Sequence, residues 1–127
     1  HLALAERIVI SPLETYNYYR REGSIVRSTF TEKRYDFFKA VAKNEEVVKR
    51  EYIQSPELKQ ALQAKKLLGG FVVIGAKADS GLKDFSKDKE LLKVEMSELL
   101  KNSKLSWKVK LKYLIFMFSP KLYLLLR

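Results

Sequence analysis

The chain has 127 residues, 46% of them hydrophobic, and a formal net charge of +10; this length and apolar content suit one folded domain with a modest core. The absence of cysteine excludes a disulfide framework and thiolate chemistry, and a single histidine, His1, excludes a site built on several histidines. The large positive charge favours association with polyanions such as nucleic acid, anionic lipid or nucleotide phosphates.

The first 28 residues predict a β hairpin. A β-branched run over 7–10 ends at Ser11-Pro12 and indicates a short strand, and the tyrosine-rich segment over 15–20 indicates a second one, with 11–14 as the turn. Residues 2–6 are typical of the last turn of a helix. Since an isolated two-stranded hairpin is marginal in water, we expect this pair to extend a larger sheet outside the present sequence, which makes the chain a fragment.

Two helices are predicted next. The sequence Thr29-Phe30-Thr31-Glu32 has the form of a capping box, with Thr29 at the cap, and predicts a helix over 31–52. Ser55-Pro56 places serine at the cap and proline at the first position of a helix over 56–78. Glycines weaken this second helix, because each costs up to about 1 kcal/mol relative to alanine, and a strand over 71–74 is the alternative. We prefer the helix, with Gly69, Gly70 and Gly75 allowing a neighbouring element to approach closely.

Helical patterns continue to the end of the chain. Ser86 is a candidate cap for a helix that reaches Asn102, and we expect its apolar residues to face inward: Phe85, Leu92, Met96 and Leu99. Further helices are predicted over 105–118 and from Ser119-Pro120 to Arg127. The predicted fold class is therefore mainly α, with a short β hairpin followed by four or five helices.

The C-terminal tail combines basic and apolar residues. From Lys104 to Arg127 the sequence has six basic residues and no acidic one. A helical segment of this composition suits a membrane interface, because apolar burial and attraction to anionic lipid add. The residues assigned to that interface are Trp107, Lys108, Lys110, Lys112, Tyr113 and Lys121. The alternative is that this segment packs against the protein core through one shared side, formed by Trp107, Leu111, Leu114, Ile115 and Phe118.

Residues 5–28, AERIVISPLETYNYYRREGSIVRS, are followed by TEKRYDFFKA, and the chain ends in SPKLYLLLR. In this order the segments resemble the C-terminal part of bacterial family 2 glycosyltransferases, of the capsule, exopolysaccharide or lipopolysaccharide type. The match is specific over 5–40, general over 43–100, and good but short over 119–127. The resemblance implies that residues 1–28 are the terminal hairpin and loop of a nucleotide-sugar-binding α/β domain of GT-A fold. Residues 29–127 would then be a C-terminal helical domain with a basic, apolar tail.

The resemblance also implies an activity for the intact enzyme: transfer of a sugar from a nucleotide-sugar donor to a glycan or lipid-linked acceptor, with a divalent metal, Mg²⁺ or Mn²⁺. The family's acidic metal-binding motif and its acidic base lie upstream of Ala5, so we expect no metal, no catalytic residue and no activity in this fragment alone. Asp79, Asp84 and Asp88 are no substitute, because they lie at a polar break and a helix start, where aspartate usually caps.

One loop can be aligned with the family. Arg20, Arg21 and Ser24 correspond to a loop near the donor diphosphate, where guanidinium and hydroxyl donors would stabilise the leaving nucleoside diphosphate. The alternative is an exposed turn with solvated charges.

No signal peptide or membrane-spanning stretch is recognisable in this sequence. We therefore expect a cytoplasmic location, peripheral at the inner face of the cell membrane. The rival functions are nucleic-acid binding and homo-oligomer assembly by a small basic helical module.

Overall fold

The computed structural model describes residues 29–51 and 55–127, and the hairpin predicted for residues 1–28 lies outside these ranges. Within them, every regular element is helical, which confirms the mainly α fold class for this part of the chain. The elements are the 3₁₀ helix η2 (Glu32–Tyr35) and the α-helices α1 (Asp36–Glu51), α2 (Pro56–Asp79), α3 (Ser86–Leu92), α4 (Met96–Lys101), α5 (Trp107–Phe118) and α6 (Pro120–Leu125).

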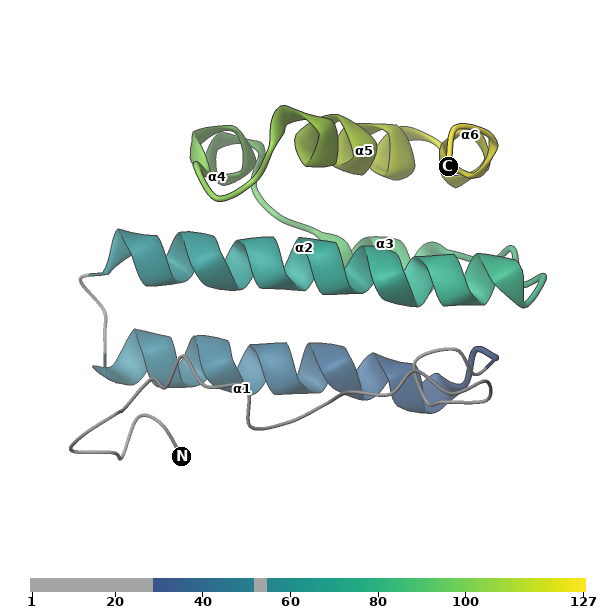
Figure 1. The fold of residues 1–127 in the computed structure, drawn as a ribbon. Coiled ribbons are helices and arrows are strands. Elements are labelled where there is room, and N and C mark those ends of the chain that lie inside the picture. The colour runs from purple at the N-terminus through teal and green to yellow at the C-terminus, as the bar shows by residue number, and fades with distance from the viewer. Residues whose placement is uncertain (1–28, 52–54) are drawn as a thin grey trace, which may run out of the picture.

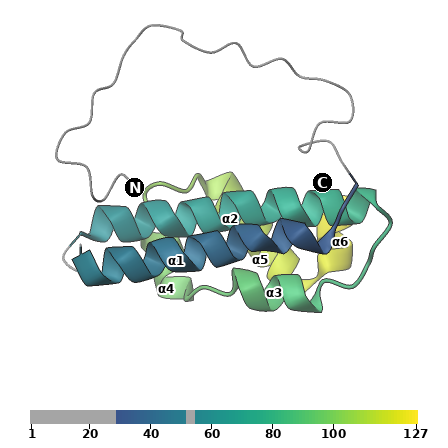
Figure 2. The same cartoon turned by 90° about the horizontal axis from the view of Figure 1, so that it is seen from below.

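Helix α2 is the central element of the fold. Helix α1 packs antiparallel along one side of α2, and helices α4, α5 and α6 form a layer on the opposite side (Figure 1). Helix α3 lies along the flank of the α1–α2 pair (Figure 2). The buried residues of α2 concentrate in its C-terminal half, where Val72 is the one exposed residue between Gly70 and Lys77, so this half of the helix lies inside the core.

An aromatic cluster joins α2 to the C-terminal layer. Phe116 of α5 is fully buried, and its ring lies edge-to-face at 6.1 Å from the ring of Phe71 and at 6.0 Å from that of Phe85. The ring of Tyr123 stacks on Phe71 at 5.6 Å. Edge-to-face and stacked pairs of this kind stabilise a core beyond their simple burial, so the cluster holds α5 and α6 against α2.

The first predicted helix begins differently from the capping box. The N-cap residue is Thr31, not Thr29, and its side chain makes no capping hydrogen bond. Glu32 instead pairs with Lys87 of α3, Nζ to Oε2 at 2.8 Å. The predicted cap was therefore wrong, because Glu32 has a long-range partner that replaces the local bond to the cap backbone.

The predicted start of the second helix is confirmed. The Ser55 hydroxyl accepts a hydrogen bond from the Leu58 N–H at 3.4 Å, and Pro56 occupies the first turn. The segment 71–74 is helical, so the strand alternative is wrong. A Cβ added at Gly70 would meet the side chains of Leu92 and Phe38, which confirms that this glycine lets neighbouring elements approach closely.

The helix predicted from Ser86 to Asn102 is interrupted. It divides into α3 and α4, with Lys93 extended between them at φ −55° and ψ 127°. The cause lies in α5: the Tyr113 hydroxyl oxygen accepts a hydrogen bond from the Val94 N–H at 3.1 Å, so this backbone group no longer needs a helical partner. Phe85, Leu92 and Leu99 are buried as predicted, whereas Met96 is exposed.

Candidate membrane-interaction surface

Helix α5 exposes an apolar stripe. Trp107, Leu111 and Phe118 lie on one side of the helix, since residues spaced by four and seven positions share a face. Phe118 is 87% exposed and Trp107 67% exposed. The core side of the helix is formed by Tyr113 and Phe116 instead. The alternative in which the Trp107 side packs inward is therefore wrong for these three residues, whereas Leu114 and Ile115 of the same predicted side do pack against the core.

Helix α6 and the residue after it also expose apolar side chains. The Ser119 hydroxyl accepts a hydrogen bond from the Leu122 N–H at 3.3 Å and caps the helix, as predicted from Ser119-Pro120. Tyr123 faces the core, and three leucines on other sides are exposed: Leu122, Leu125 and Leu126, with Leu125 at 83%. Large exposed apolar patches are uncommon on monomeric soluble proteins and mark interaction sites, so the exposed apolar residues of α5 and α6 are candidates for such a site.

Three basic residues of the tail accompany these apolar groups. Lys104, Lys108 and Lys121 are exposed. With the apolar residues they form what we call the α5–α6 surface, which consists of Lys104, Trp107, Lys108, Leu111, Phe118, Lys121, Leu122, Leu125 and Leu126.

The remaining predicted interface residues, Tyr113, Lys112 and Lys110, have contacts within the fold. Tyr113 is buried and holds the backbone of Val94, and Lys112 is half-buried, with Nζ 4.8 Å from the centre of the Phe71 ring. Lys110 donates a hydrogen bond to the Leu100 carbonyl oxygen at 2.7 Å. The assignment of Tyr113 and Lys112 to a membrane interface is thus corrected. Alternation of basic and apolar residues could not separate the two sides of this helix.

A buried ion pair was missed by the sequence analysis. Lys77 Nζ lies 2.7 Å from Asp88 Oδ2, and the Tyr35 hydroxyl contacts both side chains. Asp88 therefore serves in the core and not as a helix cap. Asp84 lies just before α3, and its Oδ1 accepts hydrogen bonds from the Ser86 N–H and hydroxyl. The N-cap residue of α3 is Phe85, without a side-chain capping bond, so the predicted cap at Ser86 was wrong. The available signal was a lone lysine on the apolar stripe of α2, in register with Phe71 and Ile74.

The polar loop residues Arg20, Arg21 and Ser24 lie outside the described residues. Among residues 29–51 and 55–127, no group of acidic or histidine side chains is placed to hold a metal ion. No helix of this part of the chain has the length and apolar character needed to cross a bilayer.

Comparisons with protein-family models, curated proteins and solved structures found no match to this chain.

Proposed function

We propose that this chain is the membrane-associating C-terminal helical region of a glycosyltransferase, and that its α5–α6 surface lies on an anionic bilayer. The observation that carries the membrane role is the exposure of Phe118, Leu125 and Trp107 beside exposed lysines. Full burial of one leucine or phenylalanine side chain contributes about 1.5–3 kcal/mol. A lysine near an anionic surface adds about 1 kcal/mol, so the groups together support stable peripheral binding.

The charge of the tail selects the kind of membrane. No acidic residue occurs between Lys104 and Arg127, so nothing within this segment repels anionic headgroups. A neutral bilayer would satisfy only the apolar side chains. We therefore expect binding that requires anionic lipid and weakens with salt, because the Debye length falls from about 10 Å at 0.1 M to about 3 Å at 1 M salt.

Sugar transfer is supported by the ordered resemblance of residues 5–40 and 119–127 to family 2 glycosyltransferases. In this proposal the intact enzyme uses a nucleotide-sugar donor, a divalent metal and a glycan or lipid-linked acceptor that the membrane-bound tail helps to reach. The Arg20–Ser24 loop would contact the donor diphosphate. Arg20→Ala and Arg21→Ala in the intact enzyme should raise KM for the donor, and unchanged donor kinetics in both would contradict this role.

Trp107 is a built-in probe for the membrane role, because it is the single tryptophan of the chain and lies on the α5–α6 surface. Vesicles of phosphatidylglycerol and phosphatidylcholine should shift its emission to shorter wavelength and co-sediment with the protein. Vesicles of phosphatidylcholine alone should do neither. Equal behaviour with both vesicle types, or tight salt-sensitive binding of random RNA in their place, would contradict the proposal.

Two variants test the surface itself. Phe118→Ser and Leu125→Ser should each weaken binding to the anionic vesicles about tenfold or more, since each removes an apolar group that enters the bilayer. Leu68→Ser is the matched control, because Leu68 is a half-exposed leucine on α2 and does not belong to the surface. Self-association of the chain that is lost in Phe118→Ser, without any vesicle binding, would instead identify a homo-oligomer interface.

A further inference from the structure

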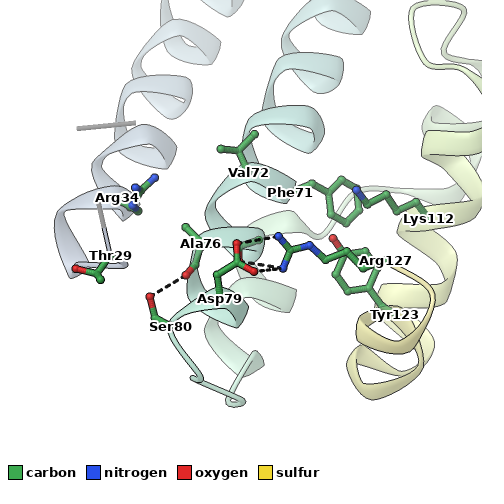
Figure 3. Close-up of a pocket in the computed structure, with 11 residues that line it drawn as sticks. Thr29, Arg34, Phe71, Val72, Ala76, Asp79, Ser80, Lys112, Tyr123 and Arg127 are labelled. Carbon is green, nitrogen blue, oxygen red and sulfur yellow. Dashed lines mark hydrogen bonds and ion pairs between the residues drawn. The ribbon is translucent and has the colours of Figure 1, made fainter. Parts of the chain in front are cut away.

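A cavity of about 580 Å³ lies over the C-terminal half of α2, between η2 and the end of α6. Its walls have two characters. Phe71, Val72 and Ala76 provide an apolar side, and charged groups from separate elements line the rest (Figure 3). Those charged residues are Arg34, Asp79, Lys112 and Arg127. Asp79 is paired with Arg127, and Lys112 adds a further positive charge to the lining.

The Tyr123 hydroxyl is an unpaired polar group in this cavity. Tyr123 is only 3% exposed, and among the described side chains its hydroxyl is the buried polar atom without a hydrogen-bond partner. In Figure 3 it points into the space bordered by Lys112 and Arg127. A buried hydroxyl without a partner costs about 1–3 kcal/mol, so its presence indicates that something else completes the bond.

Lys112 is the second incomplete group. Its Nζ lies over the rings of Phe71 and Tyr123, 4.8 and 5.5 Å from their centres, and it takes part in none of the hydrogen bonds or ion pairs formed within residues 29–51 and 55–127. Burial, together with the nearby positive charge of Arg127, lowers the pKa of Lys112. An anion beside this ammonium group would relieve both effects.

Arg127 is held at the edge of the same cavity by Asp79 and Gly75. Its Nη1 and Nη2 nitrogens each donate to one carboxylate oxygen of Asp79 at 2.9 Å, and Nη1 also donates to the Gly75 carbonyl oxygen at 3.1 Å. This two-point contact orients the planar guanidinium at the edge of the cavity. Asp79 neutralises the positive charge of Arg127. The positive charge of Lys112 has no such carboxylate partner among the described residues.

We propose that Lys112, Tyr123 and Arg127 bind the phosphoryl group of an organic phosphate, whose apolar or ring part contacts Phe71 and Val72. A phosphoryl group has three strong acceptor oxygens, which matches an ammonium, a hydroxyl and a guanidinium that approach from separate positions. A carboxylate offers fewer acceptor oxygens for the same donors. The phosphate is carried either by a soluble compound or by a lipid headgroup, and the site differs in residues from the α5–α6 surface.

Thermal unfolding of the 127-residue chain tests the soluble source. Inorganic phosphate and pyrophosphate should each raise Tm by several degrees in a saturable manner, whereas NaCl of equal ionic strength and acetate should not. Tyr123→Phe and Lys112→Met should each raise the apparent Kd about tenfold or more, because each removes one hydrogen bond to a charged group. Tyr113→Phe and Lys108→Met are the matched controls and should keep the wild-type Kd.

Co-sedimentation tests the lipid source. Vesicles with phosphatidic acid, which carries a phosphate monoester, should bind more tightly than phosphatidylglycerol vesicles of equal charge, and Lys112→Met should abolish that preference. Either the soluble or the lipid result supports the site and identifies its source. Phosphate effects equal to those of NaCl or acetate, combined with no preference for phosphatidic acid, would overturn it, as would wild-type affinity in both Tyr123→Phe and Lys112→Met.

The ligand-free variants provide an independent readout of folding. Tyr123→Phe should leave Tm without ligand equal to or above that of the wild type, because its hydroxyl has no bond to lose. Tyr113→Phe should lower Tm, since its hydroxyl holds the backbone of Val94. Loss of the membrane binding through Phe118→Ser with retained phosphate binding would separate this site from the proposed membrane role.

Discussion

The Lys77 ammonium group lies 2.7 Å from the Asp88 carboxylate in the interior of the helical core. Their side chains are 10% and 0% exposed. The Tyr35 hydroxyl donates to Asp88 Oδ1 at 3.1 Å and accepts from Lys77 Nζ at 3.0 Å, so the polar atoms satisfy one another. This cluster connects η2, α2 and α3, three elements that are separated in the sequence.

Removing one partner of this pair should destabilise the fold strongly. Asp88→Asn and Lys77→Met should each lower the free energy of unfolding by about 3–5 kcal/mol, because a buried charge remains without its partner. The double variant Lys77→Met with Asp88→Leu should lose less than the sum of the single losses. Urea unfolding measures all three. Lys87→Met is the exposed control: it breaks the pair with Glu32 and should have little effect on stability. Additive losses in the double variant would contradict coupling between Lys77 and Asp88.

The same cluster predicts a loss of stability at alkaline pH. Burial raises the pKa of Tyr35, despite the opposing hydrogen bond from Lys77. Burial alone would lower the pKa of Lys77, but hydrogen bonds to Asp88 and Tyr35 outweigh it and raise this pKa. Both groups hold their protons more tightly in the folded chain, so their stabilisation is complete below about pH 10 and is lost as the pH rises further.

The measurement is the urea midpoint at several pH values from about 8 to 11, which span the ordinary pKa values of tyrosine and lysine. The midpoint should fall across the upper part of this range. Tyr35→Phe should make the fall shallower, because one of the coupled protons is gone. A midpoint that stays level in the wild type, or the same slope in Tyr35→Phe, would count against this coupling.

Asn102 is the second buried polar anchor. It is fully buried, and its Nδ2 donates to the Gln60 carbonyl oxygen at 2.9 Å and to Gln63 Oε1 at 2.6 Å. Its Oδ1 accepts a hydrogen bond from the Lys104 N–H at 2.9 Å. Asn102→Ala should lower the free energy of unfolding by about 2–3 kcal/mol, since partly buried partners on α2, the Gln60 carbonyl oxygen and Gln63 Oε1, are left unsatisfied.

Chemical unfolding again provides the test for Asn102→Ala. Ser103→Ala is the neighbouring control, because the Ser103 hydroxyl bonds to Gln60 at an exposed position. We expect that control to change stability by less than about 0.5 kcal/mol, as is usual for surface substitutions. Equal effects of the two variants would show that burial of Asn102 is not the reason for its contribution.

Gly70 should resist replacement by alanine. In an open helix the change would stabilise by about 0.5–1 kcal/mol, because alanine has the higher helix propensity. At Gly70 the new methyl group would meet Leu92 and Phe38, so overpacking should reverse the sign and destabilise by about 1–3 kcal/mol. The free energy of unfolding decides between the two; a variant as stable as the wild type would mean that α1 and α3 can move aside.

Local sequence signals predicted the helix boundaries that depend on local bonds. Ser55-Pro56 and Ser119-Pro120 both start helices, because the serine hydroxyl and the proline ring act on residues within one turn. The capping box at Thr29 failed and the helix from Ser86 was interrupted. In both places a side chain far away in the sequence, Lys87 or Tyr113, provides the competing bond.

The candidate sites divide in the same way. By itself, the sequence determined that the chain is mainly helical, strongly basic and amphipathic at its C-terminal end, because composition and spacing are properties of neighbouring residues. Only the tertiary structure decided which side of α5 faces outward, since Phe116 packs into the aromatic cluster and leaves Phe118 exposed. It likewise decided that Lys112 and Tyr123 meet beside Arg127, a contact made by the folding of α6 against α2.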